Sequence, residues 1–217
     1  PTELLAVNGH NVVYGLDLNS DGSVAASCGA DNMIQLWDLA TGQAIRQLAG
    51  HEGPVYSIRF SDDDKLLVSA SADGTVRVWN VADGAQLKSL MTTVAEGETV
   101  PAVYDAAFNA AADMVVAADS QGIIKLWNVA SGELVRNIGE AGEAVYRVAF
   151  SENGQRLLAC GHAGTLTVRN VADGAAAFTI KLPSVAYSAE YAPGGATISA
   201  ACANGNTYLV PIPEEAR

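Results

Sequence analysis

Short apolar segments alternate with turn-forming residues along the whole chain. Residues 50–84 show the pattern most clearly, with apolar segments around residues 55–60, 66–70 and 76–79. The turn residues Asp62-Asp63-Asp64 and Asp73-Gly74 separate these segments, and Asp83-Gly84 follows the last one. Runs of about five or six residues bounded by such turns are typical of antiparallel strands. The pattern therefore predicts an all-β chain built from short strands.

The same pattern recurs at a nearly fixed interval. Five copies begin at Tyr14, Tyr56, Tyr104, Tyr146 and Tyr187, in steps of 42, 48, 42 and 41 residues. A second marker follows each tyrosine by 23 residues, at Trp37, Trp79, Trp127, Arg169 and Val210. The constant internal distance indicates that each copy is one packed unit, with length variation in the connections between units. This predicts a repeat architecture within one domain.

Each complete unit is predicted to contain four strands, which in the first unit cover about 12–18, 23–28, 33–38 and 43–48. Residues 2–7 match the segment that precedes Gly50-His51, so the chain opens with the last strand of a unit. The fifth unit ends at Val210-Pro211-Ile212-Pro213 without a fourth strand. Twenty strands in five sheets result, and the N-terminal strand can complete the last sheet, which removes its exposed edge.

The second unit resembles a WD40 repeat in Gly50-His51, Ser69-Ala70-Ser71, Asp73-Gly74 and Val78-Trp79-Asn80, and Leu36-Trp37-Asp38 supplies the Trp-Asp pair. The resemblance implies a five-bladed β-propeller of four-stranded antiparallel blades, with the last blade closed by the N-terminal strand. Residues 1–217 would form this single propeller, in units of about 9–49, 50–91, 92–138, 139–180 and 181–213 plus 1–8. A piece of a longer WD40 propeller would show the same phasing.

A polar set occurs in each of the first two units: His10, Ser27, Asp31 and Trp37, then His51, Ser69, Asp73 and Trp79. Serine, histidine and aspartate alone would suggest the triad of a hydrolase. The resemblance instead implies a buried structural tetrad in which Trp binds Ser, Ser binds His and His binds Asp. The serine position is alanine in the units that lack the histidine (Ala117, Ala159, Ala200), and loss as a set fits a network that is costly to leave half satisfied.

The five tyrosines are the candidate partner-binding residues. Strict alternation along the strand would make them core residues. A bulge at the tyrosine would instead bury residues such as Val55, Ile58 and Phe60 and turn the ring outward. The resemblance implies the second arrangement, with this position at the rim of one face, where the five tyrosines would form an anchor surface for a protein or peptide.

The net charge of −12 argues against nucleic acid and against anionic membranes as partners. The three cysteines (Cys28, Cys160, Cys202) lack a disulfide or metal spacing, and the sequence contains no cofactor motif and no apolar run of membrane length. We therefore expect a monomeric, non-catalytic scaffold without metal or cofactor. The alternative is a propeller that binds a small ligand or sugar. The compartment stays open, with a cytoplasmic location slightly favoured.

Overall fold

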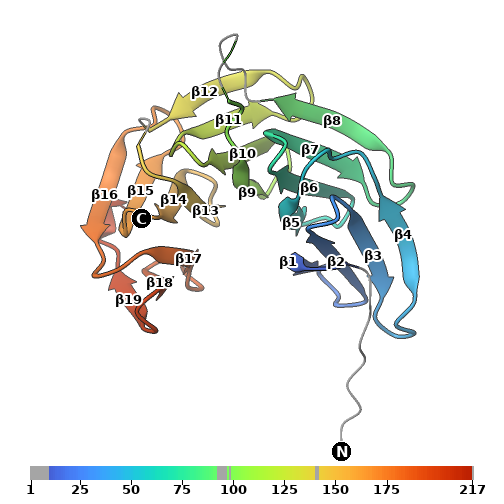
Figure 1. Cartoon of the computed structure of the whole chain (residues 1–217). Helices are drawn as coiled ribbons and strands as arrows, with labels where there is room; N and C mark the ends of the chain where they lie inside the picture. The colour runs from blue at the N-terminus through green and yellow to red at the C-terminus, as the bar shows by residue number, and fades with distance from the viewer. Residues whose placement is uncertain (1–9, 92–96, 98, 140–141, 217) are drawn as a thin grey trace, which may run out of the picture. The chain divides into compact units, whose positions relative to one another are not determined.

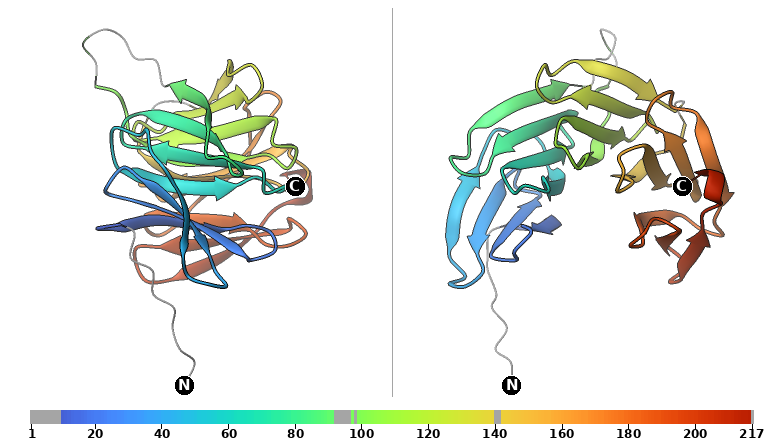
Figure 2. Two further views of the ribbon diagram at one scale, coloured as in Figure 1. Left: turned by 90° about the vertical axis from the view of Figure 1, so that its right-hand side faces the viewer. Right: turned by 180° about the vertical axis from the view of Figure 1, so that it is seen from behind.

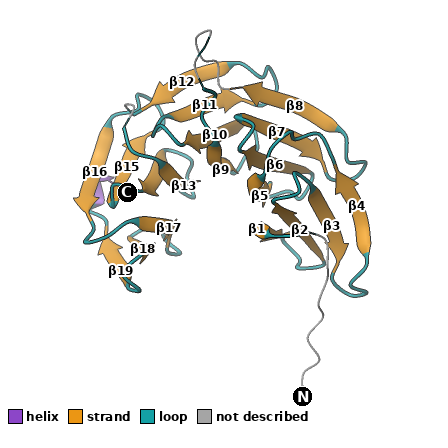
Figure 3. Ribbon diagram, viewed as in Figure 1, coloured by secondary structure: helices purple, strands orange, loops and turns teal. Residues whose placement is uncertain are grey.

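The computed structural model describes residues 10–91, 97, 99–139 and 142–216. The described chain is dominated by 19 antiparallel strands arranged in five separate sheets. It divides into two compact units, Pro1–Ala102 with two sheets and Val103–Arg217 with three. Within each sheet the strands follow one another in chain order, as Figures 1 and 2 show, and tight loops join their ends (Figure 3).

The first unit contains two four-stranded sheets. Sheet 1 consists of β1 (Val13–Leu18), β2 (Val24–Gly29), β3 (Ile34–Asp38) and β4 (Ala44–Leu48). Sheet 2 consists of β5 (Val55–Phe60), β6 (Leu66–Ser71), β7 (Thr75–Asn80) and β8 (Gln86–Met91). The four strands predicted for the first repeat, which are those of sheet 1, are therefore confirmed to within one residue at each strand end.

The second unit contains three sheets and a short terminal 3-10 helix. Sheet 3 consists of β9 (Val103–Phe108), β10 (Met114–Asp119), β11 (Ile124–Asn128) and β12 (Leu134–Ile138), and sheet 4 of β13 (Val145–Phe150), β14 (Arg156–Gly161), β15 (Thr165–Asn170) and β16 (Ala176–Lys181). Sheet 5 has three described strands, β17 (Ala186–Tyr191), β18 (Thr197–Cys202) and β19 (Thr207–Pro211), before η1 (Glu214–Ala216). The N-terminal strand predicted to complete it, residues 2–7, lies outside the described residues.

A bulge lies at the tyrosine of the first strand in all five sheets. In sheet 2, Val55 pairs with Ser71 and Ser57 with Ala70, so that Tyr56 is the extra residue. The same register shift occurs at the tyrosines of the other four sheets. The bulge lets Val55 and Ile58 both point into the core, where they are 0% and 3% exposed, and Phe60 packs at the edge of the same cluster. The predicted bulge is confirmed.

The core lies between the faces of adjacent sheets. One cluster in the first unit joins Ile34 and Leu36 of sheet 1 to Ile58, Leu67 and Trp79 of sheet 2. Two clusters in the second unit join sheet 3 to sheet 4 and sheet 4 to sheet 5. The three cysteines are buried free thiols. Burial raises the pKa of Cys28 to about 12, so that this thiol stays protonated at neutral pH.

Side-chain hydrogen bonds also connect neighbouring sheets within each unit. The Asp17 carboxylate in β1 accepts a hydrogen bond from the backbone N–H of Phe60 in β5, at 2.8 Å. In the second unit, Asp105 in β9 accepts one from the N–H of Val148 in β13, at 2.9 Å. Each carboxylate satisfies a backbone donor on the first strand of the next sheet, and such charge-assisted bonds are among the stronger ones in proteins. They fix how neighbouring sheets are aligned within each unit.

Candidate functional site

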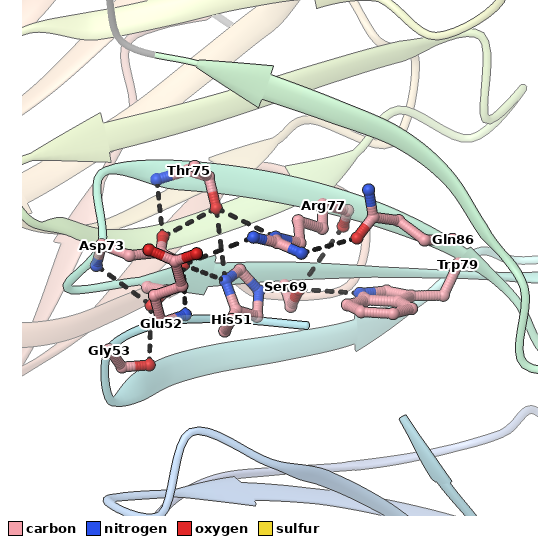
Figure 4. Close-up of polar contacts among 10 residues, drawn as sticks. His51, Glu52, Gly53, Ser69, Asp73, Thr75, Arg77, Trp79 and Gln86 are labelled. Atoms are coloured by element: carbon pink, nitrogen blue, oxygen red, sulfur yellow. Dashed lines mark hydrogen bonds and ion pairs between the residues drawn. The ribbon is translucent and has the colours of Figure 1, made fainter. Parts of the chain in front are cut away.

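The polar set of sheet 2 forms a continuous buried chain (Figure 4). The indole N–H of Trp79 donates to Ser69 Oγ at 2.9 Å, His51 Nε2 lies 2.7 Å from Ser69 Oγ, and His51 Nδ1 lies 2.8 Å from Asp73 Oδ2. One proton arrangement satisfies every bond: tryptophan donates to serine, serine to Nε2, and Nδ1–H to the carboxylate. The chain ties β6 and β7 to the loop that enters β5.

The Asp73 carboxylate gathers several donors at the turn between β6 and β7. It accepts hydrogen bonds from the Thr75 hydroxyl at 2.7 Å, the Thr75 backbone N–H at 2.9 Å and the Glu52 backbone N–H at 3.0 Å. Burial by itself would raise the pKa of Asp73, but the hydrogen bonds from His51, Thr75 and Glu52 outweigh it and hold the pKa well below its usual range. The carboxylate is therefore ionised at neutral pH.

Sheet 1 repeats this arrangement. His10 Nδ1 lies 2.8 Å from Asp31 Oδ1, His10 Nε2 lies 2.9 Å from Ser27 Oγ, and the Trp37 indole N–H donates to the same hydroxyl at 2.8 Å. The two serines are 5% and 0% exposed. A hydrolase needs a nucleophile that substrate can reach. Because Ser27 and Ser69 are buried and already hydrogen bonded on two sides, neither can act as that nucleophile.

Sheet 3 has a different buried polar pair, which the sequence reasoning missed. Asp119, at the end of β10, accepts hydrogen bonds from the backbone N–H groups of Gln121 and Ile123, both at 3.0 Å. Its second oxygen lies 3.7 Å from Nζ of Lys125 in β11, an ionic contact too long for a hydrogen bond. Burial lowers the pKa of Lys125, and the Asp119 charge acts against that effect.

None of the five tyrosines is buried. Tyr14 and Tyr187 are 49% and 61% exposed, and Tyr56, Tyr104 and Tyr146 are half-buried. The alternative that they are core residues is therefore wrong. The bulge explains the difference, because it turns each ring away from the core that its neighbours enter. Their role as a partner-binding face stays a prediction.

Within each compact unit, the tyrosines of neighbouring sheets contact one another. In the first unit the ring centroids of Tyr14 and Tyr56 are 5.4 Å apart. In the second unit Tyr146 lies 5.4 Å from Tyr104 in an edge-on arrangement and 6.0 Å from Tyr187 in a stacked one. The Tyr146 hydroxyl also lies 3.1 Å from His162 Nδ1, a contact that the sequence reasoning did not foresee. Partial burial and the neighbouring Tyr104, Tyr187 and Glu143 raise the pKa of Tyr146.

Among the described residues, no group of three or more His, Cys, Asp or Glu side chains is placed to hold a metal ion. The same part of the chain contains no helix long and apolar enough to cross a membrane.

Comparison with known families identifies the repeat. A family model described as "WD domain, G-beta repeat" matches residues 2–38, 42–80 and 132–170, which together make up more than half of the chain. Comparison with curated proteins gave no match. The second match runs from just before β4 to the end of β7, and the third from just before β12 to the end of β15. These two matches thus join the last strand of one sheet to the first three of the next, and the chain belongs to the WD40 repeat family.

Proposed function

We propose that the chain is a non-catalytic binding module that receives a protein or peptide on its tyrosine-bearing edge. WD40 repeats generally serve as protein-interaction scaffolds. The observation that carries the proposal is the aromatic row Tyr104, Tyr146 and Tyr187, three partly exposed rings of which Tyr146 contacts the other two. The same bulge presents each ring from a separate sheet, so the row is held by rigid strands.

Such a row has the physical properties of an anchor surface. Tyrosine offers a large apolar ring and a hydroxyl, and it loses little conformational freedom on binding. Residues of this type carry a disproportionate share of the binding energy at protein interfaces. Rings that already contact one another are restrained before a partner arrives, which lowers the entropic cost of association.

The test is selection of random twelve-residue peptides on the intact chain, followed by measurement of the selected peptides on two variants. We expect Tyr146→Ser/Tyr187→Ser to weaken peptide binding about tenfold or more, because truncated anchors typically cost about 2 kcal/mol or more. The matched control is Leu134→Ser/Val135→Ser, which removes two exposed apolar side chains from β12 of the same unit. Equal affinity of the peptides for the tyrosine variant and the unmodified protein would contradict the proposal.

We also propose that the five sheets of residues 1–217 form one monomeric five-bladed propeller, closed by strand 2–7 alongside β19. Two observations support it. The second and third family matches each begin two residues before a strand, β4 and β12. The first match begins at residue 2, and the same offset predicts a strand at the start of the chain. In addition, β1 exposes apolar positions whose counterparts in β5 are buried: Val13 and Leu16 are 56% and 65% exposed. An apolar strand face of this kind calls for a covering sheet.

Deleting residues 1–8 tests the closure. If strand 2–7 pairs with β19, the deletion should speed amide hydrogen exchange at residues 207–210, where the edge loses its partner, and leave exchange in β6 unchanged. Mass in solution, measured over a range of concentrations, provides the second readout. Unchanged exchange in β19 after the deletion, or a dimer that dissociates on dilution, would contradict the closed monomer.

A further inference from the structure

Sheet 4 keeps the geometry of the tetrad-bearing sheets without the tetrad. In sheet 2, Ser69 pairs with Arg77 and Leu67 with Trp79, and in sheet 4 the equivalent pairs are Ala159 with Thr167 and Leu157 with Arg169. The positions of Ser69, Asp73, Thr75, Arg77 and Trp79 are therefore taken by Ala159, Ala163, Thr165, Thr167 and Arg169. The indole of the tetrad is thus replaced by a guanidinium, and its serine and aspartate are each replaced by alanine.

A cavity of about 150 Å³ lies where these side chains were lost. Its lining includes those five residues of sheet 4 and Glu143 of the segment that enters β13. Sheet 3 and its turns contribute Gly122, Ile124 and Gly139 on the opposite side. Its volume is similar to the roughly 150 Å³ of an engineered protein cavity that holds a benzene molecule. The space therefore suits a ligand, or a side chain, of about six non-hydrogen atoms.

The lining offers hydrogen-bond donors that no described residue accepts. Arg169 donates from Nη1 to the Gly174 carbonyl at 3.1 Å, and within the described chain it has no carboxylate within 4.0 Å. The hydroxyls of Thr165 and Thr167 make no hydrogen bond to any described residue. A guanidinium with free donors beside two hydroxyls matches a planar oxyanion, above all a carboxylate.

The surrounding charges are compatible with that match. The Lys181 ammonium donates to the carbonyl of Ala163, a residue of the lining, and adds a second positive charge near the cavity. Glu143 is the opposing charge, but its side chain is 61% exposed and its carboxylate lies 3.8 Å from His162 Nε2. Solvent screens an exposed charge more strongly than a partly enclosed guanidinium. The enclosed part of the site is therefore cationic even though the chain as a whole is acidic.

We propose that the cavity of sheet 4 is a binding site for a carboxylate group, held by Arg169 with Thr165 and Thr167. The carboxylate comes either from a free small organic acid or from an aspartate or glutamate side chain of a bound peptide. The proposal does not depend on the tyrosine edge, because none of the five tyrosines lines the cavity.

The experiment titrates two probes against the intact chain by NMR: succinate for a free acid, and N-acetyl-glutamate N-methylamide for a peptide side chain. Their neutral counterparts are succinamide and N-acetyl-glutamine N-methylamide. We expect saturable binding of at least one carboxylate, with shifts centred on Thr165, Thr167 and Arg169, and none for its amide. Succinate alone indicates the free-acid source, and the glutamate probe alone indicates a peptide source.

Three variants decide whether the cavity is responsible. Arg169→Met removes the charge at similar length and should weaken binding about tenfold or more, since bonds to charged groups are the strong ones. Arg169→Trp restores the residue of sheets 1–3, fills the space and should abolish binding even if the methionine variant folds poorly. Lys88→Met, which removes a cation of the first unit, should bind like the unmodified protein. Equal binding of carboxylates and amides, no saturation, or unchanged affinity in the Arg169→Trp variant would overturn the proposal.

Discussion

Replacing Trp79 by alanine should lower the free energy of unfolding by about 3–5 kcal/mol, the usual cost of truncating a buried tryptophan. The side chain is 1% exposed and packs in the cluster that joins sheets 1 and 2. Its loss leaves a cavity and removes the donor that anchors Ser69. Urea denaturation followed by far-UV circular dichroism measures the change.

Two further variants separate packing from hydrogen bonding at this site. Trp79→Phe keeps an aromatic ring and loses the indole N–H, so we expect a smaller loss than for alanine. Leu87→Ala serves as the control, because this side chain of β8 in the same sheet is 46% exposed and its truncation should change stability by no more than about 0.5 kcal/mol. A loss below about 1 kcal/mol for Trp79→Ala would show that the tetrad contributes little to this sheet.

Replacing Asp119 by asparagine should cost about 3 kcal/mol, because it leaves the Lys125 ammonium buried without its counter-charge. The side chains of Lys125 and Asp119 are only 10% and 3% exposed. Asparagine keeps an oxygen for the N–H groups of Gln121 and Ile123, so the substitution changes mainly the charge. Chemical denaturation gives the free energy.

The double variant Asp119→Asn/Lys125→Met provides the control for this pair. It removes the unpaired ammonium and should recover most of the stability lost in the single variant, since apolar replacement of a buried ion pair is often neutral. If the double variant is no more stable than Asp119→Asn, the loss comes from the turn between β10 and β11 and the ionic contact contributes little.

Much of the fold could be predicted because the same pattern of apolar and turn-forming residues recurs at the same positions of each repeat. Apolar residues on both sides of Tyr56 cannot all face the core in a regular strand, so a bulge was required there, and the structure has it. The roles of His51, Ser69 and Trp79 could be predicted because the second unit resembles a WD40 repeat, which implies the tetrad. The loss of serine in the units that lack the histidine agreed with that expectation.

The features that sequence analysis missed depend on which side chains of different strands meet in space, and the order of residues along the chain does not show this. Lys125 lies within a strand pattern that usually places a lysine in solvent, and its burial depends on Asp119 across the β10–β11 turn. The cavity of sheet 4 arises from missing atoms, and a sequence with alanine at positions 159 and 163 does not reveal whether the neighbouring strands collapse into the space. The contact of Tyr146 with His162 likewise joins β13 to the turn that follows β14.

The exposed apolar side of β1 has a consequence for biosynthesis. Of the five sheets, sheet 1 is translated before the other four, whereas sheet 5, which is proposed to cover Val13, Leu16 and Leu18, follows them. At typical elongation rates of about 5–20 residues per second, the apolar side of β1 would stay exposed on the nascent chain for on the order of ten to thirty seconds before sheet 5 has been synthesised. A chaperone that shields the emerging N-terminal sheet would therefore raise the yield of native protein more than one that acts on the finished chain.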